Sequence, residues 1–199
     1  MSKRQVVGSV SDWPWSGVLK DLFRQIHDKS ITLEQIKSIV SGNENKFTKL
    51  ISGGADLFLD AVDGTETLVD AVEYFDVIDK CFKEWGLNER AAETPKTPVA
   101  VYEMIGNATY PEMFSKLNAD VKKICLTQHQ IKNFVMKYSV WLRKDKHSTF
   151  FLCEVNGHFF VVDVLRLNFN SYRGVYVRHF GRSRIWDAES RRRIVVPEL

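Results

Sequence analysis

One stretch near the C-terminus constrains the fold most, because it joins two apolar runs through a turn dipeptide. Residues 150–155 and 158–167 are rich in Phe, Val and Leu, and Asn156-Gly157 separates them. Asn-Gly tolerates the positive φ angles that a type I′ turn requires. The stretch therefore predicts a tight β-hairpin.

A two-residue turn at this position also decides which hairpin residues share a face. Val155 is expected to lie opposite His158, and successive pairs follow along the two strands. One face then holds Phe151, Cys153, Val155, Phe160, Val162 and Val164. The other holds Phe150, Leu152, Phe159, Val161 and Leu165, interrupted by Glu154 and Asp163. Both faces are largely apolar, so the hairpin is predicted to lie centrally in a sheet that is covered on both sides.

Other segments are predicted from the period of their apolar residues. Further strands are expected at 172–180, 184–186 and 194–196. Helices are expected at 16–27, 32–42, 44–51, 65–85 and 111–117, and from Thr127 to Leu142. Capping boxes, Thr32 with Gln35 and Thr127 with Gln130, mark two of the helix starts. The Gly42 turn invites a helix-turn-helix interpretation, but the second helix has few base-reading side chains, which favours a packing hairpin.

These elements predict an α+β protein, with an N-terminal helical region packed on a C-terminal antiparallel β-sheet of four to five strands. The expected organisation is a flexible N-terminus (1–11), a helical region (12–95) and a domain of helix plus antiparallel sheet (96–199). The two prolines within 88–98 indicate a linker or irregular crossing near that boundary.

Charge is unevenly distributed although the net charge is only +3. Residues 56–93 contain eleven acidic and three basic side chains, whereas residues 143–199 contain eleven basic and six acidic ones. After Lys146 every cationic side chain other than histidine is an arginine, eight in all. Arginine suits bidentate pairing with phosphate or carboxylate and stacking on rings.

The arginines of the C-terminal strands alternate with aromatic rings. The candidate site residues are Arg173, Tyr176, Arg178, Arg182, Arg184 and Trp186. Sheets that bind single-stranded nucleic acid combine arginine for phosphate with rings for base stacking. The alternative is that the rings are sheet core and that the arginines pair with Asp187, Glu189 and the acidic helix, which is the helix expected at 65–85 with its charged face.

Motifs for catalysis are absent from the sequence. It contains no GxSxG, Walker, GxGxxG or HExxH pattern, so no catalytic residue, metal ligand or cofactor is expected. Glu154, Asp163 and Asp187 are the only carboxylates near the sheet that could serve a metal-dependent nuclease, and they are better explained as partners of arginines. The three cysteines form no CxxC pattern and are expected to be reduced thiols. No stretch of eighteen apolar residues occurs, so a cytoplasmic protein without a membrane span is expected.

Several segments in the last two thirds of the chain are distinctive. They are 82–86 (FKEWG), 97–104 (TPVAVYEM), 126–128 (LTQ), 141–143 (WLR), 149–152 (TFFL) and 193–199 (RIVVPEL). In these segments the chain resembles uncharacterised proteins of candidate-phylum bacteria, the Patescibacteria including the Parcubacteria. The resemblance implies a bacterial, cytosolic setting and supplies no activity, cofactor or active site.

Taken together, the sequence favours a small non-enzymatic binding protein that acts on single-stranded nucleic acid through an arginine- and aromatic-rich sheet. The alternative is a protein–protein adaptor or assembly factor, which would use the acidic helix or Trp13-Pro14-Trp15. A metal-dependent nuclease is the third hypothesis.

Overall fold

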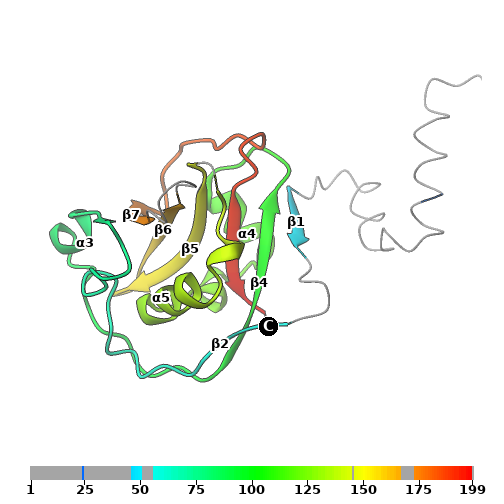
Figure 1. Ribbon diagram of the computed structural model, residues 1–199. Coiled ribbons are helices and arrows are strands. Elements are labelled where there is room, and N and C mark those ends of the chain that lie inside the picture. Colours follow the sequence, from blue (N-terminus) through cyan, green and yellow to red (C-terminus); the bar gives the residue numbers. More distant parts are fainter. Residues whose placement is uncertain (1–23, 25–45, 51–55, 145, 167–172, 199) are drawn as a thin grey trace, which may run out of the picture. The chain divides into compact units, whose positions relative to one another are not determined.

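The computed structural model describes residues 24, 46–50, 56–144, 146–166 and 173–198 (Figure 1). The chain divides into two compact units, residues 1–45 and 46–199. Of the first unit only Arg24 is described. Arg24 is helical, in agreement with the helix expected at 16–27. The rest of that helix lies outside the described residues, as do the helix expected at 32–42, the segment 1–11 and Trp13-Pro14-Trp15.

An eight-stranded sheet forms the second unit. Its strands are β1 (Phe47–Leu50), β2 (Leu57–Leu59), β3 (Val77–Ile78), β4 (Thr97–Met104), β5 (Ser148–Val155), β6 (His158–Arg166), β7 (Arg173–His179) and β8 (Arg193–Pro197). The order across the sheet is β1-β4-β8-β5-β6-β7-β3, and β2 also pairs with β4. The described helices are α3 (Cys81–Glu84), α4 (Tyr110–Leu117) and α5 (Gln128–Lys137), with 3-10 turns at Val121–Ile124 and Ser139–Trp141.

The observed sheet corrects the predicted fold class. The last strand, β8, lies between β4 and β5 and runs parallel to β5, while β3 runs parallel to β7. The sheet is therefore mixed and has eight strands, and the expected helical region on an antiparallel sheet of four to five strands is wrong. The prediction failed because β1, β2 and β3 come from the part of the chain that was expected to be helical.

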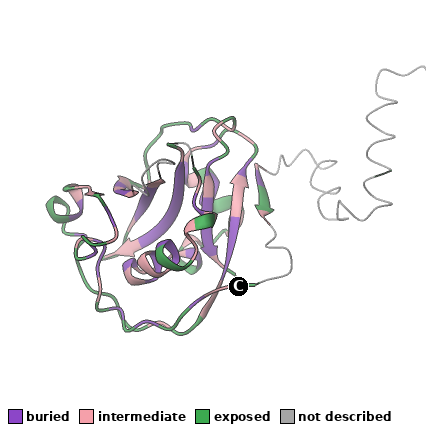
Figure 2. Ribbon diagram, in the orientation of Figure 1, coloured by how far each residue is buried: buried purple, intermediate pink, exposed green. Residues whose placement is uncertain are grey.

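The central hairpin is confirmed in turn type and in register. Asn156 and Gly157 have φ angles of 51° and 76°, both positive as a type I′ turn requires. Val155 pairs with His158, and the pairing continues without a slip to Ser148 and Leu165. Strands β5 and β6 lie in the middle of the sheet, and most of their residues are buried (Figure 2).

Two apolar cores cover the two faces of the sheet, as the hairpin pattern predicted. On one face α5 packs with Ile131, Phe134 and Val135 against a cluster that includes Phe151, Phe160, Val162 and Val177. On the other face α4 packs with Tyr110, Met113 and Phe114 against a cluster that includes Phe150, Leu152, Val161 and Ile194. We call these the α5 face and the α4 face of the sheet.

Two expected helices are corrected by the structure. The end of the predicted helix 44–51 is strand β1, which pairs along its whole length with β4. In the predicted helix 65–85 only α3 is α-helical, and β3 and turns precede it. Tertiary hydrogen bonds explain the difference. The backbone N–H groups of Asp76 and Asp79 donate to carbonyls of β7 and not to carbonyls one helical turn earlier in the chain. Helical spacing of apolar residues is outweighed there by pairing with a distant strand.

Other local predictions have mixed outcomes. Both α4 and α5 begin close to where they were expected, and the predicted capping box at Thr127/Gln130 is present. A capping box at Thr109/Glu112, which was not predicted, begins α4. The α-helix from Thr127 ends at Lys137, short of Leu142, where a 3-10 turn follows. Residues 184–186 form no strand, because Trp186 makes only an isolated bridge with Ala108. No described helix is both long enough and apolar enough to cross a membrane.

Candidate functional site

Strand β7 divides the predicted site residues between the two faces of the sheet. Tyr176 and Arg178 pair with Asp163 and Val161 and therefore lie on the α4 face. Arg173 pairs with Arg166 and lies on the α5 face, where its backbone N–H donates to Asp76 Oδ2 at 2.7 Å. The structure thus separates Arg173 from the rest of the predicted site.

The chain after β7 brings the remaining predicted residues onto the α4 face. Trp186 is anchored there by its two backbone hydrogen bonds with Ala108, and it is only 6% exposed. The guanidinium carbon of Arg184 lies 4.2 Å from the centre of the Trp186 ring, and that of Arg192 lies 4.6 Å from it. The Trp186 ring is therefore buried against two guanidiniums. Of the two rings in the predicted site, only Tyr176 is partly exposed.

A buried carboxylate lies at the centre of this group. Asp163 interrupts the apolar α4 face of β6 and is 4% exposed. Burial raises the pKa of the Asp163 carboxyl to about 6, although a hydrogen bond from Ser148 and the nearby charges of Arg178, Arg192 and Arg184 act to lower it. Asp163 consequently changes its charge close to neutral pH.

Helix α4 contributes a tyrosine to the same place. Tyr110 is the first residue of α4 and is fully buried, with its ring centre 5.4 Å from that of Trp186. Burial raises the pKa of the Tyr110 hydroxyl, the charge of Asp163 raises it further, and the charges of Arg178, Arg182 and Arg184 oppose this. Three predicted site arginines thus act electrostatically on one buried hydroxyl. We call Arg178, Arg182, Arg184 and Arg192 the arginine cluster.

Several buried polar atoms around this centre have no hydrogen-bond partner within the described part of the chain. They are Tyr110 Oη, Asp163 Oδ1, Trp186 Nε1 and Arg192 Nε. Buried polar atoms in folded proteins are nearly always paired, and unpaired ones concentrated in one place are typical of functional sites. The α4 face of β6 and β7 is therefore the strongest candidate site in the described structure.

The arginine cluster is only partly neutralised. Arg178 Nη1 lies 3.1 Å from Asp79 Oδ2, and Arg192 Nη1 lies 3.1 Å from Asp187 Oδ2. Among the described residues Arg182 and Arg184 form no ion pair, and both are exposed. Two arginines of the cluster therefore pair internally, as the alternative interpretation of the sequence expected, and two face solvent.

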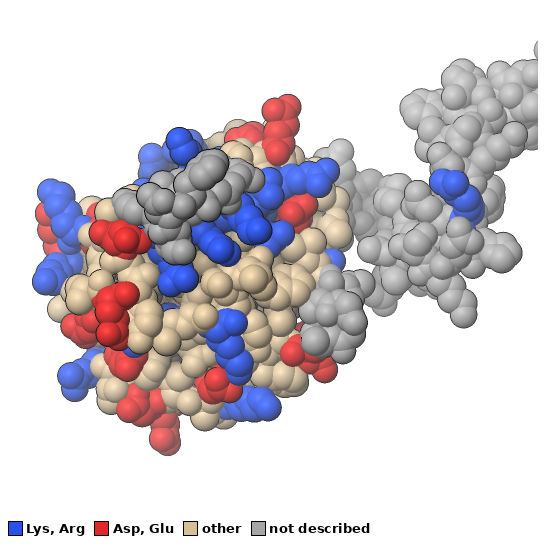
Figure 3. All heavy atoms as spheres, in the orientation of Figure 1, with Lys and Arg blue, Asp and Glu red and all other residues tan. Residues whose placement is uncertain are grey.

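The arginines on the α5 face have a different role. Arg143 Nε, Arg166 Nη1 and Arg193 Nη1 donate to the backbone carbonyls of Ser190, Ser139 and Trp141. In the view that shows α5 in front, Lys and Arg side chains gather over the upper end of the sheet, and acidic side chains lie mainly at its left and lower rim (Figure 3). The donated hydrogen bonds indicate that these arginines hold loops in place.

Sequence reasoning missed two members of the site. Tyr110 lies far from the C-terminal strands in sequence, and only the packing of α4 places it beside Asp163. Arg192 was one of three consecutive arginines, with nothing to distinguish it from its neighbours. The one available signal was Asp163 itself, a carboxylate inside an apolar strand, which the sequence already assigned to arginine partners.

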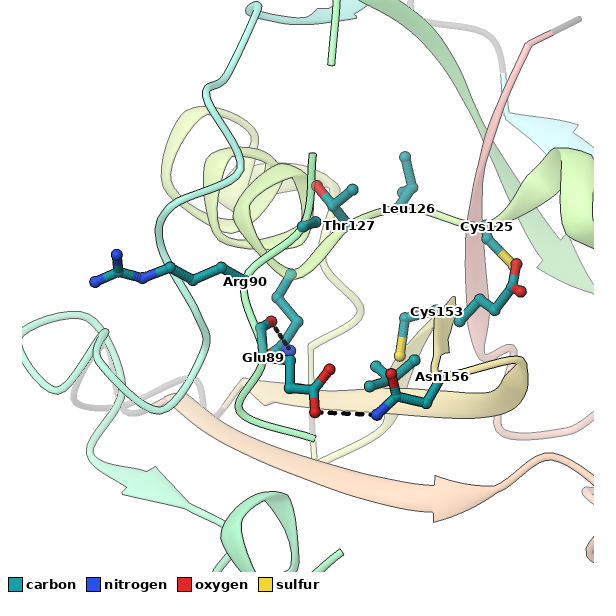
Figure 4. A pocket seen from close by; sticks show the side chains of 11 residues that line it. Glu89, Arg90, Cys125, Leu126, Thr127, Cys153 and Asn156 are labelled. Carbon is teal, nitrogen blue, oxygen red and sulfur yellow. Dashed lines mark hydrogen bonds between the residues drawn. The ribbon is translucent and has the colours of Figure 1, made fainter. Parts of the chain in front are cut away.

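A cavity of about 310 Å³ lies at the N-terminal end of α5, away from the arginine cluster (Figure 4). Cys125 and Cys153 both line it, and an Asn156 side-chain N–H donates to Glu89 Oε1 at 3.0 Å at its edge. Burial raises the pKa of each thiol to about 12. Protonated thiols are poor nucleophiles, which argues for a structural role of both cysteines.

The three carboxylates considered for a metal-dependent nuclease have separate partners. Glu154 pairs with Lys122 at 3.2 Å, Asp187 pairs with Arg192, and Asp163 is buried under the arginine cluster. Within the described ranges no group of three or more His, Cys, Asp or Glu side chains could hold a metal ion.

Comparison of the chain with protein-family models, with curated proteins and with solved structures finds no match. The site therefore has to be interpreted from its own chemistry.

Proposed function

We propose that the α4 face of β7, together with the chain that follows it, binds the phosphates of single-stranded nucleic acid, and that the protein is a non-enzymatic binding protein. The observation that carries this proposal is the pair Arg182 and Arg184, both exposed and without an ion pair among the described residues. An exposed guanidinium without a carboxylate partner can form charge-assisted hydrogen bonds with phosphate at little cost.

The balance of charge around the site supports an anionic ligand. Four guanidiniums face the carboxylates of Asp79, Asp187 and Asp163. The positive charge exceeds the negative charge, and the excess increases when Asp163 takes up a proton. Because the paired arginines occupy the inner positions, the uncompensated charge lies at the solvent surface on Arg182 and Arg184.

Tyr176 supports a nucleic-acid ligand over a simple anion. A Cβ atom at Gly174 would lie 2.8 Å from Tyr176 Cε2, so the absence of a side chain there lets the ring lie against β7. The guanidinium carbon of Arg178 lies 5.4 Å from the centre of this ring. A half-buried ring beside a guanidinium is the combination with which proteins bind bases and phosphates of single strands.

Replacing both exposed arginines tests the proposal. In Arg182→Ala/Arg184→Ala, the affinity for a labelled single-stranded RNA or DNA at low salt is expected to fall about tenfold or more. Each charged hydrogen bond contributes about 1.5–3 kcal/mol before solvent screening reduces it. Fluorescence anisotropy measures the change. Arg90→Ala/Arg191→Ala removes the same charge from exposed arginines outside the site and is expected to bind like wild type.

Two results would contradict the proposal. One is an equal loss of affinity in the two double variants, which would mean that net charge and not the site determines binding. The other is no binding by the wild type at low salt, which would favour the adaptor hypothesis.

A further inference from the structure

An aromatic groove lies at the end of the sheet where β6 begins and β7 ends, outside the arginine cluster. Its volume is about 520 Å³. The side chains that line it are Trp85, His158, Phe159, Phe160, His179 and Phe180. We call this cavity the aromatic groove. Its volume falls within the range of about 300–1,000 Å³ that is usual for small-ligand sites.

Three rings of the groove, those of Trp85, His179 and Phe160, form a stack on the α5 face that reaches solvent. Trp85 stacks on His179 with ring centres 4.1 Å apart and an interplanar angle of 26°. Phe160 lies beneath them, with its ring centre 5.7 Å from that of His179. Trp85 is 37% exposed although it is a large aromatic residue, and His179 is exposed as well. Open ring faces of this kind can bind another flat ring.

Backbone turns position the groove and join it to the arginine cluster. Gly86, with a φ of 66°, ends the α3 segment directly after Trp85, and Gly157, with a φ of 76°, forms the hairpin turn beside His158. The backbone N–H of Arg182 donates to the carbonyl of His179 at 3.2 Å. The stacked ring and the first uncompensated arginine therefore belong to one tight turn.

We propose that the aromatic groove binds an unpaired nucleobase of the same strand whose phosphates contact Arg182 and Arg184. This inference rests on the proposed function. The occupant follows from two features together, because the ring faces suit a planar aromatic ligand and the adjacent positive charge suits a ligand with an anionic backbone. Stacking depends little on base identity, so all four bases are accepted with modest preferences.

The test compares two labelled strands of equal length and equal phosphate number, oligodeoxyadenylate and its abasic analogue. The wild type is expected to bind the base-bearing strand about 5- to 100-fold more tightly, the equivalent of one stacked base. Trp85→Ala and His179→Ala are expected to abolish that preference while leaving the salt dependence unchanged. Trp85→Phe, which keeps a smaller ring, is expected to retain part of it.

Tyr74→Ala is the matched control, since it removes a partly exposed ring of the same acidic segment that lies outside the groove. It is expected to keep the full preference for bases. Equal affinity of the wild type for the two strands would contradict base binding in the aromatic groove. It would not contradict phosphate binding by the arginines.

A second measurement separates failure of the groove from failure of the proposed function. Adenosine, which has no phosphate, is titrated into the intact protein while the indole N–H resonance of Trp85 is followed by NMR. A saturable shift that is absent in His179→Ala supports the groove even if neither strand binds through the arginines. A Trp85 resonance that does not shift contradicts base binding in the aromatic groove, whether or not the arginines bind phosphate.

Discussion

At the scale of single residues, Asp163 determines the charge of the site. Its carboxyl is buried beneath the α4 face, where Arg178, Arg184 and Arg192 favour the ionised form and burial disfavours it. Burial is the larger influence, and it raises the pKa to about 6 from the 3.8 of an ordinary aspartate. A carboxyl whose pKa is raised by folding binds its proton more tightly in the folded state than in the unfolded state.

The upward shift of the Asp163 pKa on folding predicts that stability declines as the pH rises. The contribution of Asp163 is fully present below about pH 4 and is lost as the pH rises through about 6, a change of about 3 kcal/mol in the free energy of unfolding. Asp163→Asn, which cannot ionise, is expected to lack this decline. Urea unfolding of the two proteins between pH 4 and pH 7 measures the difference.

The control for Asp163 is Glu154→Gln, because Glu154 is a carboxylate of the same hairpin that pairs with Lys122 near the surface. This variant is expected to show the wild-type decline. An identical decline in wild type and Asp163→Asn would show that the buried carboxyl does not titrate in this range.

At the scale of elements, the hairpin turn depends on backbone conformation alone. A Cβ atom at Gly157 would meet nothing within 4 Å, yet its φ of 76° is one that β-branched residues adopt only with strain. Gly157→Val is expected to lower the free energy of unfolding by about 1–2 kcal/mol. Gly181→Val is the control, because Gly181 also has open space but no left-handed backbone conformation. Equal stability of the two variants would contradict this account of the turn.

The acidic segment, residues 56–93, is held to β7 by the side chains of Asp76 and Asp79. Asp76 Oδ2 accepts from the backbone N–H of Arg173 at 2.7 Å. Asp79 Oδ1 accepts from the backbone of Cys81 at 3.1 Å, and Oδ2 accepts from Arg178 at 3.1 Å and from the backbone of Val177 at 3.4 Å. Although burial opposes the shift, these hydrogen bonds and the charge of Arg178 hold the pKa of Asp79 below its usual value. The predicted contact between acidic segment and arginines is thereby confirmed.

Removing this carboxylate tests how strongly the acidic segment is held. Asp79→Ala is expected to cost about 2–3 kcal/mol of stability, as for the loss of hydrogen bonds to a charged group. Glu93→Ala, an exposed carboxylate of the same segment, is expected to cost less than 0.5 kcal/mol, about the range for exposed surface substitutions. If chemical denaturation shows similar losses for both variants, Asp79 does not anchor the segment.

The elements that could be predicted from the sequence are those whose chemistry is local. The Asn156-Gly157 turn and the capping box at Thr127 depend on neighbouring residues, and both are present. Strand β4 was missed because its identity comes from pairing with β1, β2 and β8, which are distant along the chain. The same limit applies to the site, where arginines and Tyr176 were recognised by composition but the role of Tyr110 depends on the packing of α4.

At the scale of the whole molecule, the charged segments of the chain compensate each other only in part. The acidic segment neutralises Arg178 through Asp79, and several arginines of the α5 face donate to loop carbonyls. Arg182 and Arg184 form no ion pair in the described structure, and Arg182 follows the groove residue Gly181 directly. We therefore expect one phosphate-binding surface. Arg143, Arg166 and Arg193 instead stabilise the fold through hydrogen bonds to backbone carbonyls.

The dependence of nucleic-acid affinity on salt tests this central claim most directly. On a single strand each neutralised phosphate contributes about −0.7 to the slope of log K against log salt, so Arg182 and Arg184 together predict a slope of about −1.4. In Arg182→Ala/Arg184→Ala the slope is expected to flatten to near zero, whereas Trp85→Ala is expected to weaken binding without changing the slope. A wild-type slope near zero, or a slope that the arginine substitutions leave unchanged, would contradict the account.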